Sequence, residues 1–375
     1  MEYRLDELFD LQMGKTPARK NPEYWNSNDH KWISIADLSK CEKYITETKE
    51  HISSIAVKES GISEIPANTV IMSFKLSIGK TAITKEPIYS NEAIMSFRDK
   101  GVTPILPDYI YYMFSGRDWS KGSNTAVMGT TLNKATLSQI KINIHDYEKQ
   151  KRIVELLDKV SSIISKRKQE LVELDDLIKA RFIEMFGDPE DDWEEVKIAD
   201  ICTDMRTGPF GSALHHNEFV DSGIFVLGID NAVENRFSYN RMRYITEEKY
   251  EKLKRYTVHP GDVIITIMGT VGRSAVIPKD MPKAINTKHL ACLTPNTDMV
   301  DSYFLTNAFQ IHPVIRQQLE YQSKGAIMDG LNLTIIKGLT FRLPPLDLQK
   351  QFIAFYNQVD KSKYNYSSSS LFLGI

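Results

Sequence analysis

Residues 148–186 constrain the fold more than any other stretch, because they contain neither proline nor glycine and are rich in Leu, Ile, Lys and Glu. Their apolar residues recur in steps of four and three, with Arg167 and Arg181 in the two gaps, which is the 3.5-residue period of a coiled-coil seam. The seam consists of Ile153, Leu157, Val160, Ile164, Leu171, Leu174, Ile178 and Met185. At roughly 1.5 Å per residue, this helix would be about 58 Å long. We expect a spacer between two globular parts; the alternative is one long helix buried inside a single domain.

The composition is that of an ordinary globular protein. A length of 375 residues predicts two domains, and 42% hydrophobic residues supply sizeable cores. The three cysteines are far apart and form no CxxC pair, which predicts a reducing, cytoplasmic location and no zinc site. No apolar run reaches about 18 residues, so we expect no membrane span. The net charge of −2 does not indicate a nucleic-acid binder but allows one, since an acidic region can mask a basic face.

The sequence on either side of the long helix is repeated. Two pairs of segments match at an offset of 193 residues and two more at 199. The pairs are 68–72 with 261–265, 77–83 with 270–276, 132–133 with 331–332, and 150–153 with 349–352. The unit is therefore a block followed by a helix, present twice. Two similar blocks on one axis suit a protein that reads two half-sites on DNA.

Each block is predicted to mix short strands with helices. Short apolar runs bounded by Asn, Gly and Pro predict strands at 32–35, 69–74, 92–97, 224–227, 262–267 and 290–293, and helices around 109–114 and over 302–321. The fold class is then α+β, with two similar domains separated by a long coiled-coil helix and followed by a shorter one. The expected parts are a first domain at 1–146, the central helix at 147–187, a second domain at 188–345, and a distal helix with a tail at 346–375.

The distal helix is expected to be truncated. The repeat predicts nearly forty helical residues from about Leu348, but after Lys363 the sequence contains Ser367–Ser370, which is poor in helix formers. A short distal helix would leave Leu171, Leu174, Ile178 and Met185 of the seam exposed, so that the protein would self-associate or dissolve poorly.

Two Gly-Lys-Thr triplets, at 14–16 and 79–81, do not predict a nucleotide-binding loop. That loop needs a glycine five residues before the glycine of the triplet, where this chain has Phe9 and Phe74. The second triplet aligns with 272–274 in the repeat, so a shared tight turn explains it.

Other enzyme signatures are also missing. The adjacent pair His215 and His216, and the distant His289, lack partners at metal-ligand spacing. Acidic residues at 188–195 surround Pro189 and indicate a solvated hinge rather than an acid–base pair. We find no dinucleotide fingerprint, serine-hydrolase elbow or helicase signature. The sequence therefore predicts a binding protein rather than an enzyme.

Basic, polar and aromatic residues gather in loops broken by glycine or proline, at matching places in both blocks. Arg and Lys can bond guanine edges, Asn and Gln adenine edges, and hydroxyls hold phosphates. One such loop alone is more often a solvated surface, but its recurrence in both copies favours DNA contact. The residues predicted to contact DNA are Lys15, Thr16, Arg19, Lys20, Lys75, Lys80, Asn124, Arg206, Thr207, Ser212, Arg241, Arg243, Arg273, Asn286, Lys288 and Lys324.

With these features, the chain resembles the specificity (S) subunit of type I restriction–modification systems. No single motif is specific, but the ordered set, present twice, covers most of the chain to about Lys363. The motifs are Leu5-Asp6-Glu7-Leu8, Phe186-Gly187-Asp188-Pro189, Gly208-Pro209-Phe210-Gly211-Ser212, Gly261-Asp262-Val263-Ile264, Leu343-Pro344-Pro345-Leu346 and Gln349-Lys350-Gln351.

The resemblance implies that each block is a target-recognition domain that reads half of a bipartite double-stranded DNA site. The long helices would form an antiparallel coiled coil that sets the half-site spacing and docks two modification subunits. Those partners would carry S-adenosylmethionine, and restriction subunits would use ATP and Mg²⁺. This chain would bind no cofactor or metal and have no catalytic residue.

Two other classes of function stay open from the sequence. The chain could be a truncated interaction scaffold, or decoy, that binds modification subunits without directing methylation. It could also be a nuclease or methyltransferase with an unrecognised site, although the missing cofactor motifs argue against that. DNA-dependent methylation separates the first alternative from a working specificity subunit, and activity of the purified chain would reveal the second.

Overall fold

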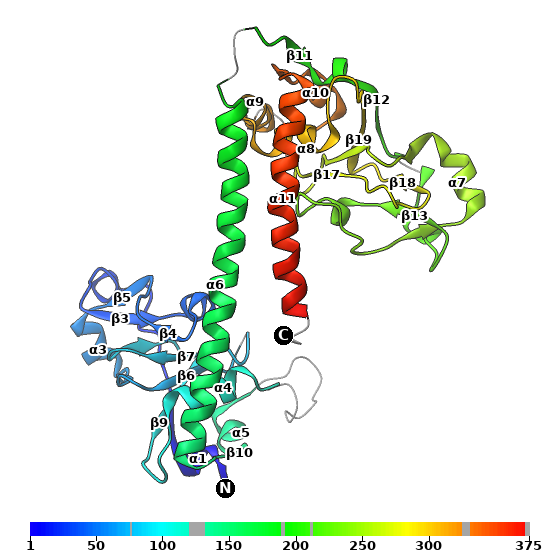
Figure 1. Cartoon of the computed structure of the whole chain (residues 1–375). Coiled ribbons are helices and arrows are strands. Elements are labelled where there is room, and N and C mark those ends of the chain that lie inside the picture. Colours follow the sequence, from blue (N-terminus) through cyan, green and yellow to red (C-terminus); the bar gives the residue numbers. More distant parts are fainter. Residues whose placement is uncertain (76, 120–131, 189–191, 211–212, 325–330, 372–375) are drawn as a thin grey trace. The chain divides into compact units, whose positions relative to one another are not determined.

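The computed structural model describes residues 1–75, 77–119, 132–188, 192–210, 213–324 and 331–371. The chain forms two compact units, Met1–Ser165 and Lys166–Ile375, and one helix continues from the first into the second (Figure 1). Within the described ranges, no helix combines the length and the apolar character that crossing a membrane requires.

Unit 1 contains three sheets. Their strand orders are β2-β9-β6-β7-β4, β5-β3-β8 and β1-β10. The strands are β1 (Glu2–Arg4), β2 (Phe9–Met13), β3 (His30–Ile33), β4 (Tyr44–Ile45), β5 (Glu50–Ile52), β6 (Val70–Ser73), β7 (Thr81–Thr84), β8 (Tyr89–Ser90), β9 (Ile94–Asp99) and β10 (Lys141–Asn143). The helices are α1 (Leu5–Leu8), η1 (Pro22–Tyr24), α2 (Ile35–Lys40), α3 (Ser54–Ser60), α4 (Pro107–Ser115), α5 (Lys134–Ser138) and the first part of α6 (Tyr147–Phe186).

Unit 2 repeats this plan. Its strand orders are β12-β19-β16-β17, β14-β13-β18-β15 and β11-β20. The strands are β11 (Glu195–Lys197), β12 (Cys202–Thr207), β13 (Ile224–Leu227), β14 (Tyr244–Ile245), β15 (Thr257–Val258), β16 (Val263–Thr266), β17 (Ser274–Val276), β18 (Ala284–Asn286), β19 (Leu290–Pro295) and β20 (Thr340–Arg342). The helices are η2 (Ile198–Ile201), η4 (His216–Glu218), η5 (Ile229–Asn231), α7 (Glu247–Leu253), η6 (Lys254–Tyr256), α8 (Ser302–Ile311), α9 (Pro313–Lys324), α10 (Leu333–Gly338) and α11 (Leu346–Leu371).

The predicted repeat is confirmed at the level of single hydrogen bonds. At the end of β6, the Ser73 hydroxyl donates to the carbonyl of Ser77 and accepts from the amide of Lys80. At the end of β16, the Thr266 hydroxyl makes the same two bonds, 193 positions later, with Thr270 and Arg273. The resemblance between 79–81 and 272–274 is therefore a shared tight turn, as predicted.

Each block is fastened to the long helix that follows it by a buried glutamine. The Gln150 side chain of α6 donates to the carbonyls of Pro104 and His145 and accepts from the amide of Leu106. All four residues lie in unit 1.

In unit 2, the Gln349 side chain of α11 makes the same set of bonds, donating to the carbonyls of Met299 and Pro344 and accepting from the amide of Asp301. Because a buried amide must satisfy its donors and acceptor, these bonds fix how each helix leaves its block.

An ion pair adds a second tie in each unit. Lys43 pairs with Asp158 of α6, and Arg236, 193 positions after Lys43, pairs with Asp360 of α11.

The predicted central helix, from 148 to 186, is confirmed as α6, which begins one residue earlier. Two other expectations are corrected. The strand expected at 32–35 ends at Ile33, because the Ser34 hydroxyl caps α2 by accepting from the amide of Asp37. The helix expected over 302–321 is two helices, because Pro313 cannot continue α8 beyond His312.

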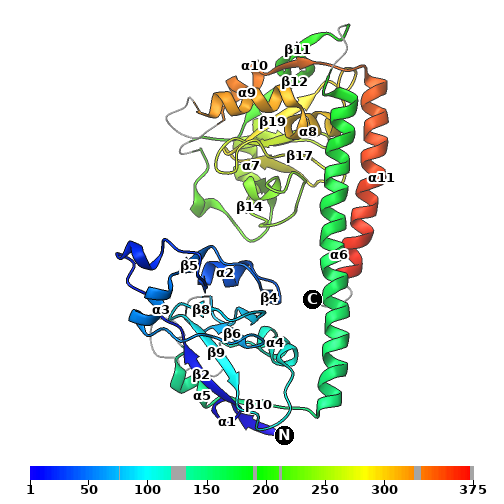
Figure 2. The same ribbon diagram turned by 90° about the vertical axis from the view of Figure 1, so that its left-hand side faces the viewer.

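The distal helix is shorter than the central one, with 26 residues against 40, but the expectation of an exposed seam is wrong. In unit 2, α11 lies antiparallel to the second half of α6 (Figures 1 and 2). Ile178 is buried, Leu174 and Met185 pack against the same core, and Leu171 is half-buried. The contacts come from residues of α11 that precede the serine run: Phe352, Ile353 and Val359.

The apolar residues that α6 does expose lie outside the predicted seam. They are Tyr147, Leu156, Ile163, Val172, Leu177 and Ile183.

Candidate nucleic-acid interface

A cavity of about 500 Å³ lies in unit 2 beside the ends of two parallel strands, β13 and β18. The residues that follow these strands, 228–230 and 287–289, form much of its wall. The remaining wall comes from the loop after β12 and from the segment before β14. Carboxyl ends of parallel strands gather loop side chains at one edge, which is where such sheets commonly bind ligands.

The charged groups of the cavity wall are mainly basic. Arg241, Arg243 and Lys288 stand against one carboxylate, Asp230, and His289 lies beside them. Burial, reinforced by the positive charges of Lys288 and Arg243, lowers the pKa of His289 below its ordinary value. The imidazole is therefore neutral at neutral pH and offers one donor and one acceptor.

The loop that carries the two arginines is held by hydrogen bonds between one buried side chain and the backbone of the loop. The buried Asn231 side chain accepts from the amide of Gly228 and donates to the carbonyls of Ser238 and Asn240. Arg241 adopts a left-handed backbone, with φ of 49°. Such a conformation costs free energy in a non-glycine residue, and residues of this kind cluster at functional sites.

Gly228 gives Arg243 its place. A Cβ at Gly228 would lie 2.6 Å from the Nη1 atom of Arg243, so a larger residue there would displace the end of the arginine side chain. The Nη2 atom of Arg243 donates to Asp230 Oδ2 at 2.7 Å, and Arg241 Nη1 lies 3.6 Å from Asp230 Oδ1. The carboxylate thus orients the guanidinium of Arg243, while Arg241 lies beyond hydrogen-bond distance.

Unit 1 carries its basic residues in the loop after β2. Arg19 donates to both carboxylate oxygens of Glu50, and its guanidinium lies 3.8 Å from the ring centroid of Trp25. Lys15 bonds the carbonyl of Ser60. The loop is therefore an ordered basic surface.

The predicted DNA-contacting residues differ in where they lie. Arg241, Arg243 and Lys288 come together at the cavity, and Thr207 is half-buried at the end of β12. Exposed or partly exposed side chains elsewhere are Lys15, Thr16, Arg19, Lys20, Lys75, Lys80 and Arg273. Asn124 and Ser212, and the side chain of Lys324, lie outside the described residues.

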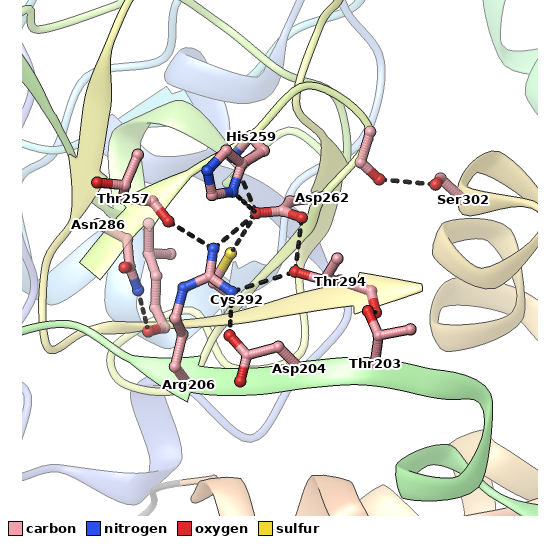
Figure 3. A network of polar contacts seen from close by, with 12 residues as sticks. Thr203, Asp204, Arg206, Thr257, His259, Asp262, Asn286, Cys292, Thr294 and Ser302 are labelled. Carbon is pink, nitrogen blue, oxygen red and sulfur yellow. Dashed lines mark hydrogen bonds and ion pairs between the residues drawn. The ribbon is translucent and has the colours of Figure 1, made fainter. Parts of the chain in front are cut away.

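Arg206 and Asn286 are directed into the protein, so we no longer assign them to DNA. The Arg206 side chain is 14% exposed, and it donates to Asp204, Thr294 and Asp262 (Figure 3). The Asn286 side chain is fully buried and donates to the carbonyl of Leu290. Ion pairs and hydrogen bonds within the fold account for both residues.

Asp262 is the centre of that network. Its carboxylate is 1% exposed and accepts from Arg206 at 2.8 Å, the amide of His259 at 2.9 Å and the hydroxyl of Thr294 at 2.8 Å. Burial, with the negative charge of Asp262, raises the pKa of the Cys292 thiol far above its ordinary value. The Gly-Asp-Val-Ile motif at 261–264 is therefore structural here.

Sequence reasoning missed Glu50, Asp230 and Asn231. Nothing in their local sequence marks them, because each acts on a side chain or loop that the fold brings near. Among the described residues, no group of three or more His, Cys, Asp or Glu side chains could hold a metal ion.

Comparison with known families gives two matches that together span most of the chain. The model described as "Type I restriction modification DNA specificity domain" matches residues 1–174 and 190–366.

Two proteins illustrate the similarity. The type I restriction enzyme MjaIX specificity subunit of Methanocaldococcus jannaschii is 23% identical over 388 residues, which cover 93% of this chain and 84% of that protein. The HindI specificity subunit of Haemophilus influenzae is 27% identical over 195 residues, covering 48% of this chain and 40% of that protein.

Two solved structures share the fold. One, from work on complex assembly and conformational transition of the type I R-M system, has a TM-score of 0.61 at 16% identity and covers 100% of this chain and 94% of its own. The S subunit from M. genitalium has a TM-score of 0.55 at 13% identity, with coverage of 100% and 93%.

Proposed function

Because this chain belongs to the type I restriction modification DNA specificity family, we propose that it reads a bipartite DNA site on behalf of partner subunits. It is a specificity subunit, and its relatives of that kind are non-catalytic. The substrate of recognition is double-stranded DNA, and the chemistry belongs to the partners.

The observation that carries this proposal is the repeated unit, down to its hydrogen bonds. Two blocks with the same turn and the same glutamine joint are suited to reading two separate half-sites. We assign the first half-site to residues 1–146 and the second to 188–345. The helices at 147–187 and 346–375 would connect them and set the spacing.

The partners would be modification subunits docked along α6, joined by restriction subunits. The exposed apolar side chains Leu156, Ile163 and Leu177 supply a surface for them, since the 3.6-residue turn brings the three to one face of the helix and an exposed apolar strip favours association. S-adenosylmethionine, ATP and Mg²⁺ would be bound by these partners.

Adenine methylation in a host tests the proposal. The full chain is co-expressed with its modification subunit in a strain without adenine methyltransferases, and the host DNA is read by methylation-sensitive sequencing. The expected result is one motif with two specific parts separated by unspecified bases.

Other outcomes decide against parts of the proposal. A palindromic motif would mean that one block of each of two chains is used. A complex that forms and purifies without methylating DNA would favour the interaction scaffold. Failure of the complex to form would refute the docking role.

A further inference from the structure

We propose that each recognition domain reads a guanine through one arginine that a carboxylate holds in place. The arginines are Arg19, held by Glu50, and Arg243, held by Asp230. This inference rests on the proposed function and deepens it by naming specificity-determining residues and a base. It also assigns Glu50 and Asp230 as positioning residues.

The two pairs occupy the same position in the repeated fold. In unit 1, β3 pairs with β5 so that Trp32 lies opposite Glu50. In unit 2, β13 pairs with β14 in the same way, and the amide of Val226 donates to the carbonyl of Arg243. Glu50, the first residue of β5, and Arg243, the residue directly before β14, thus occupy equivalent positions beside equivalent strands.

A second pair of matching backbone hydrogen bonds supports that equivalence. The residues after Trp32 and Val226, Ile33 and Leu227, each accept a backbone hydrogen bond at the end of the parallel strand pair. The donors are Asn91 in unit 1 and Thr287 in unit 2.

In unit 2 the arginine directly precedes the edge strand β14, and the carboxylate comes from η5. The guanidinium lies against Gly228, whose missing side chain leaves room for it. One N–H of Nη2 is used by Asp230 at 2.7 Å. A guanidinium has five N–H donors, so donors remain to face the cavity.

In unit 1 the positions of the two partners are exchanged, because the carboxylate of Glu50 lies on the edge strand β5 and the arginine comes from the loop after β2. Arg19 is also stacked, with its guanidinium carbon 3.8 Å from the Trp25 ring centroid and 4.7 Å from that of Trp32. Both oxygens of Glu50 are engaged, which leaves three of the five donors.

A structural role alone explains these pairs poorly. The side chains are 49% and 36% exposed for Arg19 and Glu50, and 33% and 34% for Arg243 and Asp230. Ion pairs this exposed contribute little to stability. What the carboxylate does achieve is to fix the plane of a long, flexible side chain, which reduces the entropy lost when the arginine binds.

Guanine is the base that fits such a group. It presents two acceptors, O6 and N7, side by side in the major groove, and a planar guanidinium bonds both at once. Lysine cannot reproduce this geometry, because its ammonium is a point charge. Because arginine and carboxylate exchange positions between the two units, the two arginines are placed differently, and we expect the two half-sites to differ in sequence.

The test is the methylation motif of the full complex with single variants. Arg243→Lys should relax one guanine in one half of the motif, with discrimination against other bases falling roughly 5- to 150-fold. Arg19→Lys should do the same in the other half only. Each variant is thus the control for the other.

The positioning residues are tested by a graded pair of changes. Asp230→Asn should relax the same motif position as Arg243→Lys, and Asp230→Glu should restore it. A carboxylate that merely stabilised the fold would instead reduce methylation at all sites equally. The matched control is Arg4→Lys. Arg4 also pairs with a carboxylate, since its Nε atom lies 3.0 Å from Asp6 Oδ1, and its side chain is 43% exposed, but it belongs to neither of the two proposed pairs. It should leave the motif unchanged.

The outcomes separate this inference from the function on which it rests. A wild-type motif that Arg19→Lys and Arg243→Lys leave intact, or relax in both halves together, would overturn the inference and spare the function. A wild-type motif with no guanine in one half would overturn the inference for the domain that reads that half and would spare the function. Absence of any wild-type motif would refute the function and the inference together.

Discussion

Stability of unit 2 should fall in mild acid because of one buried histidine. His312 lies at the junction of α8 and α9 and is 1% exposed. Its ring lies against Phe182 and Phe341, with centroids 6.1 and 5.5 Å away. Among the described residues, neither ring nitrogen has a hydrogen-bond partner. Burial lowers the pKa of His312 from 6.5 to about 4.

The sign follows from which state takes up the proton. Above pH 6.5 the imidazole is neutral whether folded or unfolded, so it adds no pH dependence. Between pH 6.5 and about 4 the unfolded state binds a proton that the folded state refuses, so the free energy of unfolding drops as pH falls. The loss reaches about 2 kcal/mol at pH 5 and approaches about 3 kcal/mol near pH 4.

The perturbation is His312→Leu, which replaces the imidazole by an apolar side chain of similar volume. Hydrogen exchange by mass spectrometry is measured on the full chain at pH 7.5 and pH 5, with wild type and variant compared at each pH so that intrinsic exchange rates cancel. Between the two pH values, α8 in the wild type should lose about 30-fold more protection than in the variant. Strands β6 and β7 of unit 1 serve as the internal control.

Parallel pH dependence of α8 protection in the two proteins would refute the reasoning. It would mean that the folded state accommodates the imidazolium, and the burial argument would fail. A change in the control strands of equal size would show that the effect is not local to unit 2.

Three further predictions concern stability. Asp262→Asn should lower the free energy of unfolding by about 3 kcal/mol, because Arg206 would keep a buried charge without its main partner; a thermal melt within 1 °C of wild type would contradict this. Gly14→Ala should lower the free energy of unfolding by about 2 kcal/mol or more, since the new Cβ would lie 2.1 Å from a backbone carbonyl oxygen. Gly338→Ala should lower it by almost nothing, because no atom lies within 4 Å of the new Cβ. Urea denaturation compares the two variants, and equal midpoints would count against the packing argument. Gln150→Ala should cost roughly 2–4 kcal/mol by leaving three backbone groups unpaired; calorimetry would expose a smaller loss and a joint held by other contacts.

The long-range organisation was readable from the sequence. The central helix was predicted to within one residue, because a heptad pattern without Pro or Gly has few alternatives. The repeat was readable because tight turns restrict residue choice, as the glycines at 79 and 272 show, with φ of 90° and 78°.

The sequence did not allow us to predict which polar side chains face solvent. Arg206 and Arg243 both lie in polar stretches of the sequence, yet Arg206 pairs with Asp262, 56 residues away, while Arg243 lines a cavity. The pairing of Arg19 with Glu50 likewise depends on strand pairing across 31 residues. Such distances are set by the tertiary fold and leave no local pattern.

The burial of the seam could not be predicted for a different reason. Helix propensity disfavours the serine-rich end, whereas burial of Phe352, Ile353 and Val359 before that end anchors α11. Tertiary packing outweighs propensity in such a case.

The glutamine joint bears on how the two halves of the chain could diverge. Gln150 and Gln349 bond only main-chain atoms of their blocks, so the joint makes no demand on the side chains there. The partners at corresponding places are Pro104 and Met299, Leu106 and Asp301, and His145 and Pro344. Every partner has changed between the copies while the bonds persist. Mutational drift can therefore rewrite the surface of either block freely while its attachment is inherited intact.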